Sequence, residues 1–228
     1  MKAILTGASG LIGQGVLIEC LSDPRVETVL SLGRSPSGAS DAKLTEIVHP
    51  DLFALSTLED RLRGYDACFY CAGAGVIGSS LDDYRRITYD MTLHVAQTLA
   101  RVQPGMMFVY VSGAGSDSHN PLPWFRIKGE IEQALQALPL RTVLFRAGGV
   151  QPVAGVRSRH AWLQSLYTLG APGLSFAARH LPSTFTTTEC MGRAMIAVAA
   201  QSAPPAVLTN AQINRLGGSE DSDVSTGA

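Results

Sequence analysis

The sequence predicts an α/β fold built on a doubly wound parallel sheet with helices on both faces. Short apolar segments alternate with helical patterns along most of the 228 residues. The apolar share is 46% and the charged share only 16%, against roughly 25% charged residues in an average soluble domain. Much of the chain must therefore be buried, which fits a sheet covered on both faces and is also compatible with an apolar homo-oligomer interface.

Six strands are expected, each a short apolar run bounded by turn residues. They are Ala3–Thr6, Thr28–Leu32, Glu46–His49, Ala67–Cys71, Met107–Ser112 and Thr142–Arg146. Helical patterns lie between most of them, over about 11–22, 56–63, 80–101 and 123–138. Strands alternating with helices form right-handed βαβ units, so ligands should bind at the carboxyl ends of parallel strands.

The regular alternation ends after Arg146. We expect one domain over residues 1–215, with a substrate-side insertion over 147–185, a helix near 187–201 and a mobile tail of small and acidic residues over 216–228. Five residues of the insertion could line a pocket, although packing or solvent-exposed roles suit them better: Arg157, Arg159, His160, Trp162 and His180.

Charge and hydropathy exclude two classes of partner. The net charge of −1 and the pI near 6.5 give no basic excess for binding nucleic acid. No apolar run approaches the roughly 18 residues that a membrane-spanning helix needs. The regularly spaced glycines of the first segment suit a structural role better than a signal peptide. The expectation is a cytoplasmic protein that binds small molecules.

Cys68 and Cys71 form a C-x-x-C pair, a pattern that also occurs in zinc sites and redox pairs. They lie in an apolar run that predicts a buried strand. Residues three apart on a strand point to opposite faces, so we expect buried, reduced thiols. No metal-ligand spacing is present elsewhere, and no metal site is expected.

The segment "AILTGASGLIGQGV" places three glycines between the first strand and its helix. Glycine permits left-handed backbone angles and lets backbone amides approach a pyrophosphate at a helix N-terminus. The alternative is a tight turn that binds nothing, but the position in a βαβ unit favours a dinucleotide. The residues expected to approach it are Gly7, Ser9, Gly10, Leu11, Ile12 and Gly13.

The second strand is followed by Arg34 and Ser35 rather than by a carboxylate. A carboxylate about 20 residues beyond the glycine loop normally binds the adenosine ribose of NAD. A guanidinium in that place can bind a 2′-phosphate through two hydrogen bonds. The sequence therefore favours NADP(H) over NAD(H), with a solvated surface arginine as the alternative.

Six segments in order carry a family resemblance: "TGASGLIG", "LGRS", "HPDL", "YCAGAG", "YVSGAGS" and "FRIKGEIE". Together they resemble an atypical short-chain dehydrogenase/reductase, a Rossmann-fold NAD(P)-binding relative of the nucleotide-sugar epimerases and dehydratases. The resemblance spans residues 1–150 and continues more weakly to about 215. It implies that Asp51 and Leu52 border the adenine and that Cys71, Ala72 and Gly73 lie along the cofactor. The long substrate domain of the sugar-nucleotide enzymes is missing, which favours a small substrate.

The same resemblance implies a catalytic Tyr, a Lys four residues later, and a Ser at the end of the preceding strand. Ser112 and Lys128 match two of these positions, and Trp124 stands at the Tyr position. An indole N–H can donate a hydrogen bond but cannot shuttle a proton near neutral pH. Substitutes could come from the following loop or the strand end: Ser112, Ser116, Asp117 or His119.

The position of Lys128 on its helix supports a role independently of the family. At 100° per residue, an apolar stripe faces the sheet and Lys128 lies about 40° from its first member. The stripe consists of Trp124, Ile127, Ile131, Leu135 and Leu138. A cation beside this face needs a partner, and ribose hydroxyls would serve. Snorkelling, or an ion pair with Glu132 one turn on, is the alternative.

Three functions remain open at this point. The first is an NADPH-dependent oxidoreductase acting on a small carbonyl compound, in which Lys128 holds the ribose and Ser112 binds the substrate oxygen. The second is a catalytically impaired NADP(H)-binding regulatory or scaffold protein. The third, an interaction domain without a cofactor, has the least support, because the glycine loop and the strand pattern would then have no ligand.

Overall fold

The computed structural model describes residues 1–76, 78–152 and 183–218. Its main sheet has seven strands, all parallel, in the order β3-β2-β1-β4-β5-β6-β9. The strands are β1 (Lys2–Thr6), β2 (Thr28–Gly33), β3 (Leu44–Val48), β4 (Ala67–Tyr70), β5 (Met107–Gly113), β6 (Arg141–Ala147) and β9 (Val207–Thr209). The predicted doubly wound parallel sheet is confirmed.

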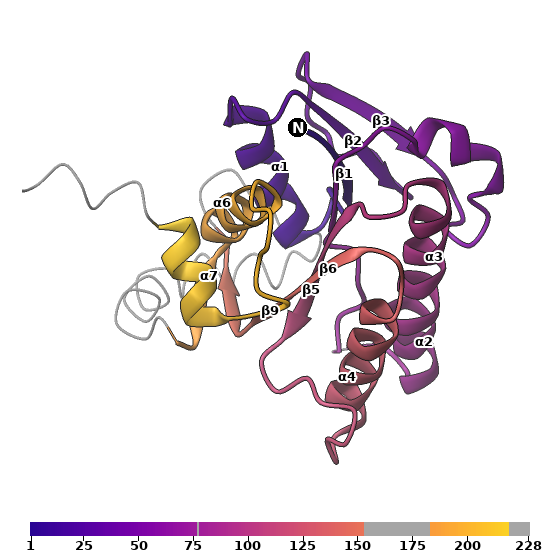
Figure 1. Ribbon diagram of the computed structural model, residues 1–228. Coiled ribbons are helices and arrows are strands. Elements are labelled where there is room, and N and C mark those ends of the chain that lie inside the picture. The colour runs from indigo at the N-terminus through magenta and orange to yellow at the C-terminus, as the bar shows by residue number, and fades with distance from the viewer. Residues whose placement is uncertain (77, 153–182, 219–228) are drawn as a thin grey trace, which may run out of the picture.

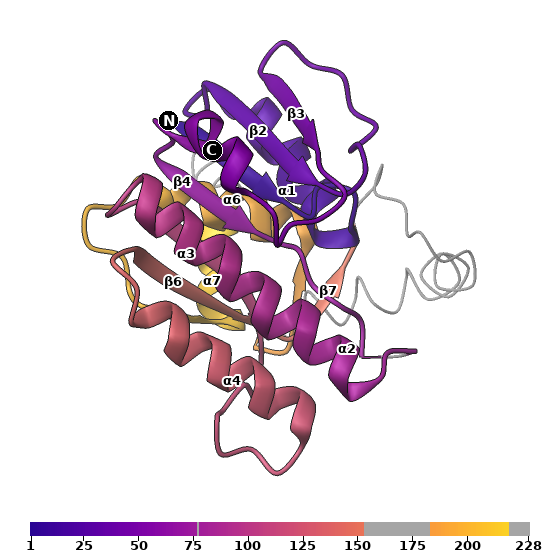
Figure 2. The ribbon, with the colours of Figure 1, turned by 90° about the vertical axis from the view of Figure 1, so that its right-hand side faces the viewer.

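Helices cover both faces of this sheet (Figure 1). One face carries α1 (Leu11–Ser22), α6 (Thr188–Ala199) and α7 (Asn210–Gly217). The other carries α2 (Leu81–Arg85), a π-helical turn η2 (Arg86–Met91), α3 (Thr92–Val102) and α4 (Pro123–Gln136). Figure 2 shows α3 and α4 lying side by side across the sheet. A short 3₁₀ helix, η1 (Ser56–Leu62), follows β3.

Alternating residues of the strands feed two separate hydrophobic cores. Phe69 and Phe145 pack beneath α1 and α6, whereas Tyr70 and Phe108 pack beneath α3 and α4. Cys68 belongs to the second core, and Cys71 packs against the first. The two thiols therefore lie on opposite faces of the sheet, as their spacing predicts, and both are free.

Several predicted boundaries need correction. The third strand begins two residues earlier than expected, at Leu44, and the helix predicted over 80–101 is three consecutive segments, because a π-helical turn interrupts its hydrogen-bond ladder. The segment predicted as a helix over 56–63 is a 3₁₀ helix. Helix α7 continues to Gly217, so the tail does not begin at 216.

Two small elements near the insertion are new relative to the prediction. Strands β7 (Gly149–Gln151) and β8 (Phe185–Thr187) pair in parallel as a separate two-stranded sheet. The residues between them that the sequence singled out, from Arg157 to His180, lie outside the described residues. β9 and α7 complete the main sheet and its covering layer.

Candidate functional site

The glycine turn after β1 is closely packed against its own helix and against the end of β4. Gly7 has a φ of +74°, and a Cβ there would lie 2.6 Å from the Ala72 nitrogen. A Cβ on Gly13 would lie 2.0 Å from the Gly7 carbonyl oxygen. Any side chain at either position would displace the backbone. The turn therefore brings bare backbone to the N-terminus of α1, where anions bind.

A cavity of about 200 Å³ opens at this turn. It lies where the strand order reverses, since β1 is flanked by β2 on one side and β4 on the other, and ligands of doubly wound sheets bind at such a point. Nine residues expected at the cofactor line it: Gly7, Ser9, Gly10, Arg34, Ser35, Leu52, Cys71, Ala72 and Gly73. Gly33, Ile87 and Met91 also line it and were not expected. Leu11, Ile12 and Gly13 form the first turn of α1 instead.

A second cavity of about 260 Å³ shares Arg34, Leu52, Ile87 and Met91 with the first. Asp51 lines it, together with Arg86, whose guanidinium lies 5.5 Å from the centre of the Phe53 ring. Within the described part of the chain, neither arginine forms an ion pair. Two arginines without ion-pair partners among the described residues thus line this outer cavity, together with Asp51 and Asp83.

At the end of β5, Ser112 is buried and its hydroxyl lies 2.9 Å from that of Ser116. The Ser116 hydroxyl also accepts a hydrogen bond from the Gly113 nitrogen at 3.3 Å. This fixes the Ser112 hydroxyl at a strand end next to β4, whose following residues line the first cavity. A hydroxyl so held can orient the oxygen of a bound substrate.

Lys128 reaches the same strand end from α4. Its Nζ donates to the Val111 carbonyl oxygen at 3.4 Å and lies 5.7 Å from the centre of the Tyr110 ring. Burial lowers the pKa of the Lys128 ammonium to about 8, against a smaller opposing effect from the Glu132 carboxylate. Both protonation states are therefore populated near neutral pH.

Trp124 is half-buried and lies edge-on to Tyr84 of α2, with ring centres 4.9 Å apart and an interplanar angle of 87°. The expected stripe on α4 is observed for Ile127, Ile131 and Leu135, which are buried. Trp124 departs from it, because it is only half-buried and its ring packs against Tyr84 of α2. Leu138, the last expected member, follows the end of α4.

The sequence did not identify the partner of Glu132. The carboxylate is buried and accepts hydrogen bonds from Arg146 Nε at 3.1 and 3.2 Å and from Arg146 Nη2 at 2.5 Å. The expected alternative, an ion pair between Lys128 and Glu132, is therefore not formed. A pair of residues 14 apart on different elements leaves no periodic signal.

The loop after β5 offers no buried proton donor besides its serines. His119 is exposed, and its ring lies 3.5 Å from the exposed Asp117 carboxylate. The backbone N–H of His119 donates to Asp117 and lowers the pKa of that carboxyl group. Ser116 alone among these loop residues contacts Ser112.

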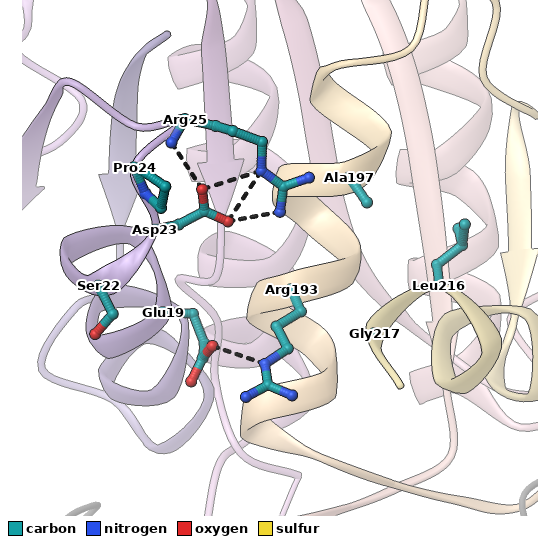
Figure 3. A pocket seen from close by; sticks show the side chains of 9 residues that line it. All are labelled: Glu19, Ser22, Asp23, Pro24, Arg25, Arg193, Ala197, Leu216 and Gly217. Atoms are coloured by element: carbon teal, nitrogen blue, oxygen red, sulfur yellow. Dashed lines mark hydrogen bonds and ion pairs between the residues drawn. The ribbon is translucent and has the colours of Figure 1, made fainter. Parts of the chain in front are cut away.

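A further cavity, of about 240 Å³, lies between α1, α6 and α7 (Figure 3). Its arginines are already matched by acids. Arg193 lies 3.0 Å from Glu19 and 2.6 Å from Glu189, and Arg25 lies 2.6 Å from Asp23. A bound anion would have to displace these carboxylates, in contrast to the groove beside Arg34.

Over residues 1–76, 78–152 and 183–218, no cluster of His, Cys, Asp or Glu could hold a metal ion. In the same ranges, no helix has the length and hydropathy needed to cross a bilayer.

The family model described as "NAD dependent epimerase/dehydratase family" matches residues 3–121. Among curated relatives, "Protein fmp52, mitochondrial" of Emericella nidulans is 29% identical over 178 residues, covering 74% of this chain and 75% of the relative. "Protein fmp52-1, mitochondrial" of Aspergillus oryzae is 31% identical over 150 residues, covering 63% of each. These relatives are named mitochondrial, which contradicts the expected cytoplasmic location. The expectation failed because composition does not specify a compartment.

Solved structures with the same fold have lower sequence identity. MoeE5 in complex with UDP-glucuronic acid and NAD is 19% identical, with a TM-score of 0.68 over 91% of this chain and 75% of that chain. WbmF of Bordetella bronchiseptica in complex with NAD⁺ is 17% identical, with a TM-score of 0.66 over 96% and 79%.

Proposed function

Because the chain belongs to the NAD dependent epimerase/dehydratase family, we propose that it binds NADP(H) in the groove between β1, β2 and β4 and acts as an oxidoreductase on a small carbonyl compound. The observation that carries the proposal is the cavity at the strand-order reversal, lined by the glycine turn and by Arg34. The dinucleotide class follows from the family, and the phosphate preference and the substrate are the proposed parts.

The backbone around the groove fits a dinucleotide. Gly7 and Gly13 let the turn pack tightly against its helix and the residues after β4, since a Cβ there would lie 2.6 and 2.0 Å from other backbone atoms. Unpaired N–H groups in the first turn of α1 can bind the pyrophosphate. Leu52, Ile87 and Met91 supply an apolar lining where the adenine would lie.

The choice of NADP(H) over NAD(H) rests on charge. Arg34 and Arg86 border the adenosine end of the groove without ion-pair partners in the described ranges. A 2′-phosphate would give them charge-assisted hydrogen bonds, which contribute about 1.5–3 kcal/mol each. Asp51 and Asp83 line the outer cavity too, so the proposal depends on Arg34, which also lines the first cavity.

The residues at the end of β5 suit carbonyl reduction, in which bound NADPH supplies the hydride. The Ser112 hydroxyl, held by Ser116 at 2.9 Å, donates a hydrogen bond to the substrate oxygen. Lys128 holds the ribose hydroxyls, and its ammonium, with a pKa of about 8, can donate a proton to the new alkoxide through a water molecule and is then re-protonated from solvent. A donor works best when its pKa lies near the operating pH.

The test is NADPH oxidation across a panel of small aldehydes and ketones, run on wild type, Lys128→Ala and Trp124→Tyr. Turnover in wild type that Lys128→Ala abolishes is the expected result. Restoring the family's Tyr should raise the rate by about 10²–10⁴-fold if proton transfer limits it. Tight NADPH binding without turnover by wild type or Trp124→Tyr would overturn the proposed reaction.

The packing of Trp124 favours a second candidate, an NADP(H)-binding regulatory or scaffold protein. The indole is held edge-on by the buried Tyr84 ring, a structural role that needs no proton transfer. This candidate requires cofactor binding that changes stability or partner affinity without turnover. Steady catalysis that depends on Lys128 would eliminate it.

A further inference from the structure

Lys128 lies one helical turn before a buried carboxylate with which it forms no ion pair. Residues four apart on a helix face each other and commonly form ion pairs. In this chain, both Glu132 oxygens are occupied by Arg146 of β6, at distances of 2.5 to 3.2 Å. Among the described residues, the hydrogen-bond partner of Lys128 Nζ is the Val111 carbonyl oxygen, at 3.4 Å.

The other charged or titratable groups around α4 do not neutralise Lys128. Burial raises the pKa of the Tyr110 phenol well above its usual value, so this ring stays neutral beside the ammonium. The carboxylate of Glu130 binds Arg85 of α2 at 2.7 Å. Asp117 is exposed and acts on Arg146 rather than on Lys128. Glu132 is therefore the carboxylate that affects the Lys128 ammonium most.

The geometry leads to an inference that rests on the proposed cofactor. We propose that Arg146 is a positioning residue, which holds Glu132 and thereby keeps the Lys128 amine free for the ribose of NADP(H). Without Arg146, a buried carboxylate would lack a counter-ion, an arrangement that strongly destabilises a protein. Lys128 is one turn away and could move to fill that place, which would withdraw its amine from the end of β5.

The chain allows a direct test that needs no cofactor. It contains three lysines, Lys2, Lys43 and Lys128, so NMR titration of ¹³Cε-labelled lysine can follow each one. Arg146→Met should raise the midpoint of Lys128 by about one pH unit or more, because a freed carboxylate stabilises the ammonium. Adding Glu132→Gln to that variant should cancel the rise, and Arg146→Lys, which retains a cation, should stay close to wild type.

Calorimetric titration with NADPH supplies the second measurement. Arg146→Met should weaken NADPH binding by about 10-fold or more, the usual range for removing one charged contact, and the double variant should regain most of that loss. If the ion pair between Arg146 and Glu132 were merely structural, the double variant would bind NADPH as weakly as Arg146→Met or more weakly.

The outcomes separate the inference from the proposed function. An unchanged Lys128 midpoint in folded Arg146→Met overturns the inference, whatever the protein binds. The Lys128 midpoint could rise in Arg146→Met although the wild-type protein binds no NADPH. That result would support the exchange of ion-pair partners, but it would overturn both the link to the ribose and the proposed function. If Arg146→Met does not fold, Glu132→Gln alone must lower the Lys128 midpoint, and an unchanged midpoint there also overturns the inference.

Discussion

The nucleotide groove and the edge formed by β5 and α4 lie at neighbouring strand ends, yet they differ in how completely they retain the family's pattern. The groove has the glycine turn, an apolar lining of Leu52, Ile87 and Met91, and the Arg34 side chain in one place. The α4 edge has Ser112 and Lys128, but Trp124 packs against Tyr84 where a proton donor is expected. In the proposed function, Lys128 belongs to both regions, whereas Trp124 affects proton transfer alone.

The two regions also differ in how their charged side chains are paired. Arg34 and Arg86 border an open cavity without ion pairs in the described ranges. At the α4 edge, Arg146 and Glu132 neutralise each other and leave one lysine without a carboxylate. A cation kept without its counter-ion reduces stability, and such arrangements concentrate at functional sites. Among the described residues, Lys128 therefore combines burial with the lack of an ion-pair partner, the property on which its proposed role depends.

The largest expected effect comes from adding a side chain to the glycine turn. Gly13→Ala places a Cβ 2.0 Å from the Gly7 oxygen, so the turn must shift, and displacements of about 1 Å cost roughly 100-fold in function. We expect NADPH binding to fall by at least that factor and unfolding free energy to fall by about 1–3 kcal/mol. Calorimetry and urea denaturation measure both.

Gly73→Ala is the matched control for the stability measurement. A Cβ there meets nothing within 4 Å, and the residue has no positive φ. Its unfolding free energy should stay within about 1 kcal/mol of wild type. Equal destabilisation by the two variants would show that close packing at Gly13 is not the cause of the effect.

The next effect concerns the adenosine end of the groove. Arg34→Ala should weaken NADPH binding by about 10- to 100-fold, the equivalent of about 1.5–3 kcal/mol from charge-assisted hydrogen bonds, and leave NADH binding nearly unchanged. Comparative titrations of the two cofactors check this. Equal weakening for both would show that Arg34 does not contact a 2′-phosphate.

Lys128 should make stability depend on pH. Its pKa in the folded protein is about 8, below its usual 10.5, so the unfolded chain binds this proton more tightly. The ammonium destabilises the fold at pH 7, and stability should rise as the pH increases from about 8 to 10.5. Lys128→Met should raise the unfolding free energy at pH 7 by about 1–3 kcal/mol, with the difference shrinking at higher pH. A pH-independent difference would contradict this.

The smallest expected effect is the coupling energy between Trp124 and Tyr84. A double-mutant cycle with Trp124→Leu and Tyr84→Leu should give a coupling of about 0.5–1.5 kcal/mol, as expected for an edge-to-face pair. Urea denaturation of the four proteins measures it. A coupling near zero would show that the two rings pack independently and would weaken the structural explanation for Trp124.

The sequence predicts the features that depend on short-range pattern. The glycine turn, the first strands and the buried stripe on α4 follow from spacing within a few residues of one another. The π-helical turn over Arg86–Met91, which brings Ile87 to the cofactor cavity, does not. It depends on how a helix packs, and a periodic pattern cannot reveal it.

Contacts between distant elements were also beyond the sequence. Glu132 and Arg146 come from α4 and β6, and Tyr84 and Trp124 come from α2 and α4. Strand β9 has only three residues, too few for alternation to show. The glycine turn is a local structure that the sequence reveals, whereas the contacts around α4 depend on tertiary packing.

Calorimetric titration of the wild-type protein with NADPH and with NADH tests the proposed groove directly. We expect both to bind in the groove of Gly7, Gly10 and Arg34, and NADPH to bind about 10-fold tighter or more, as for one added charge-assisted contact. Binding of neither cofactor, or tighter binding of NADH, would contradict this proposal.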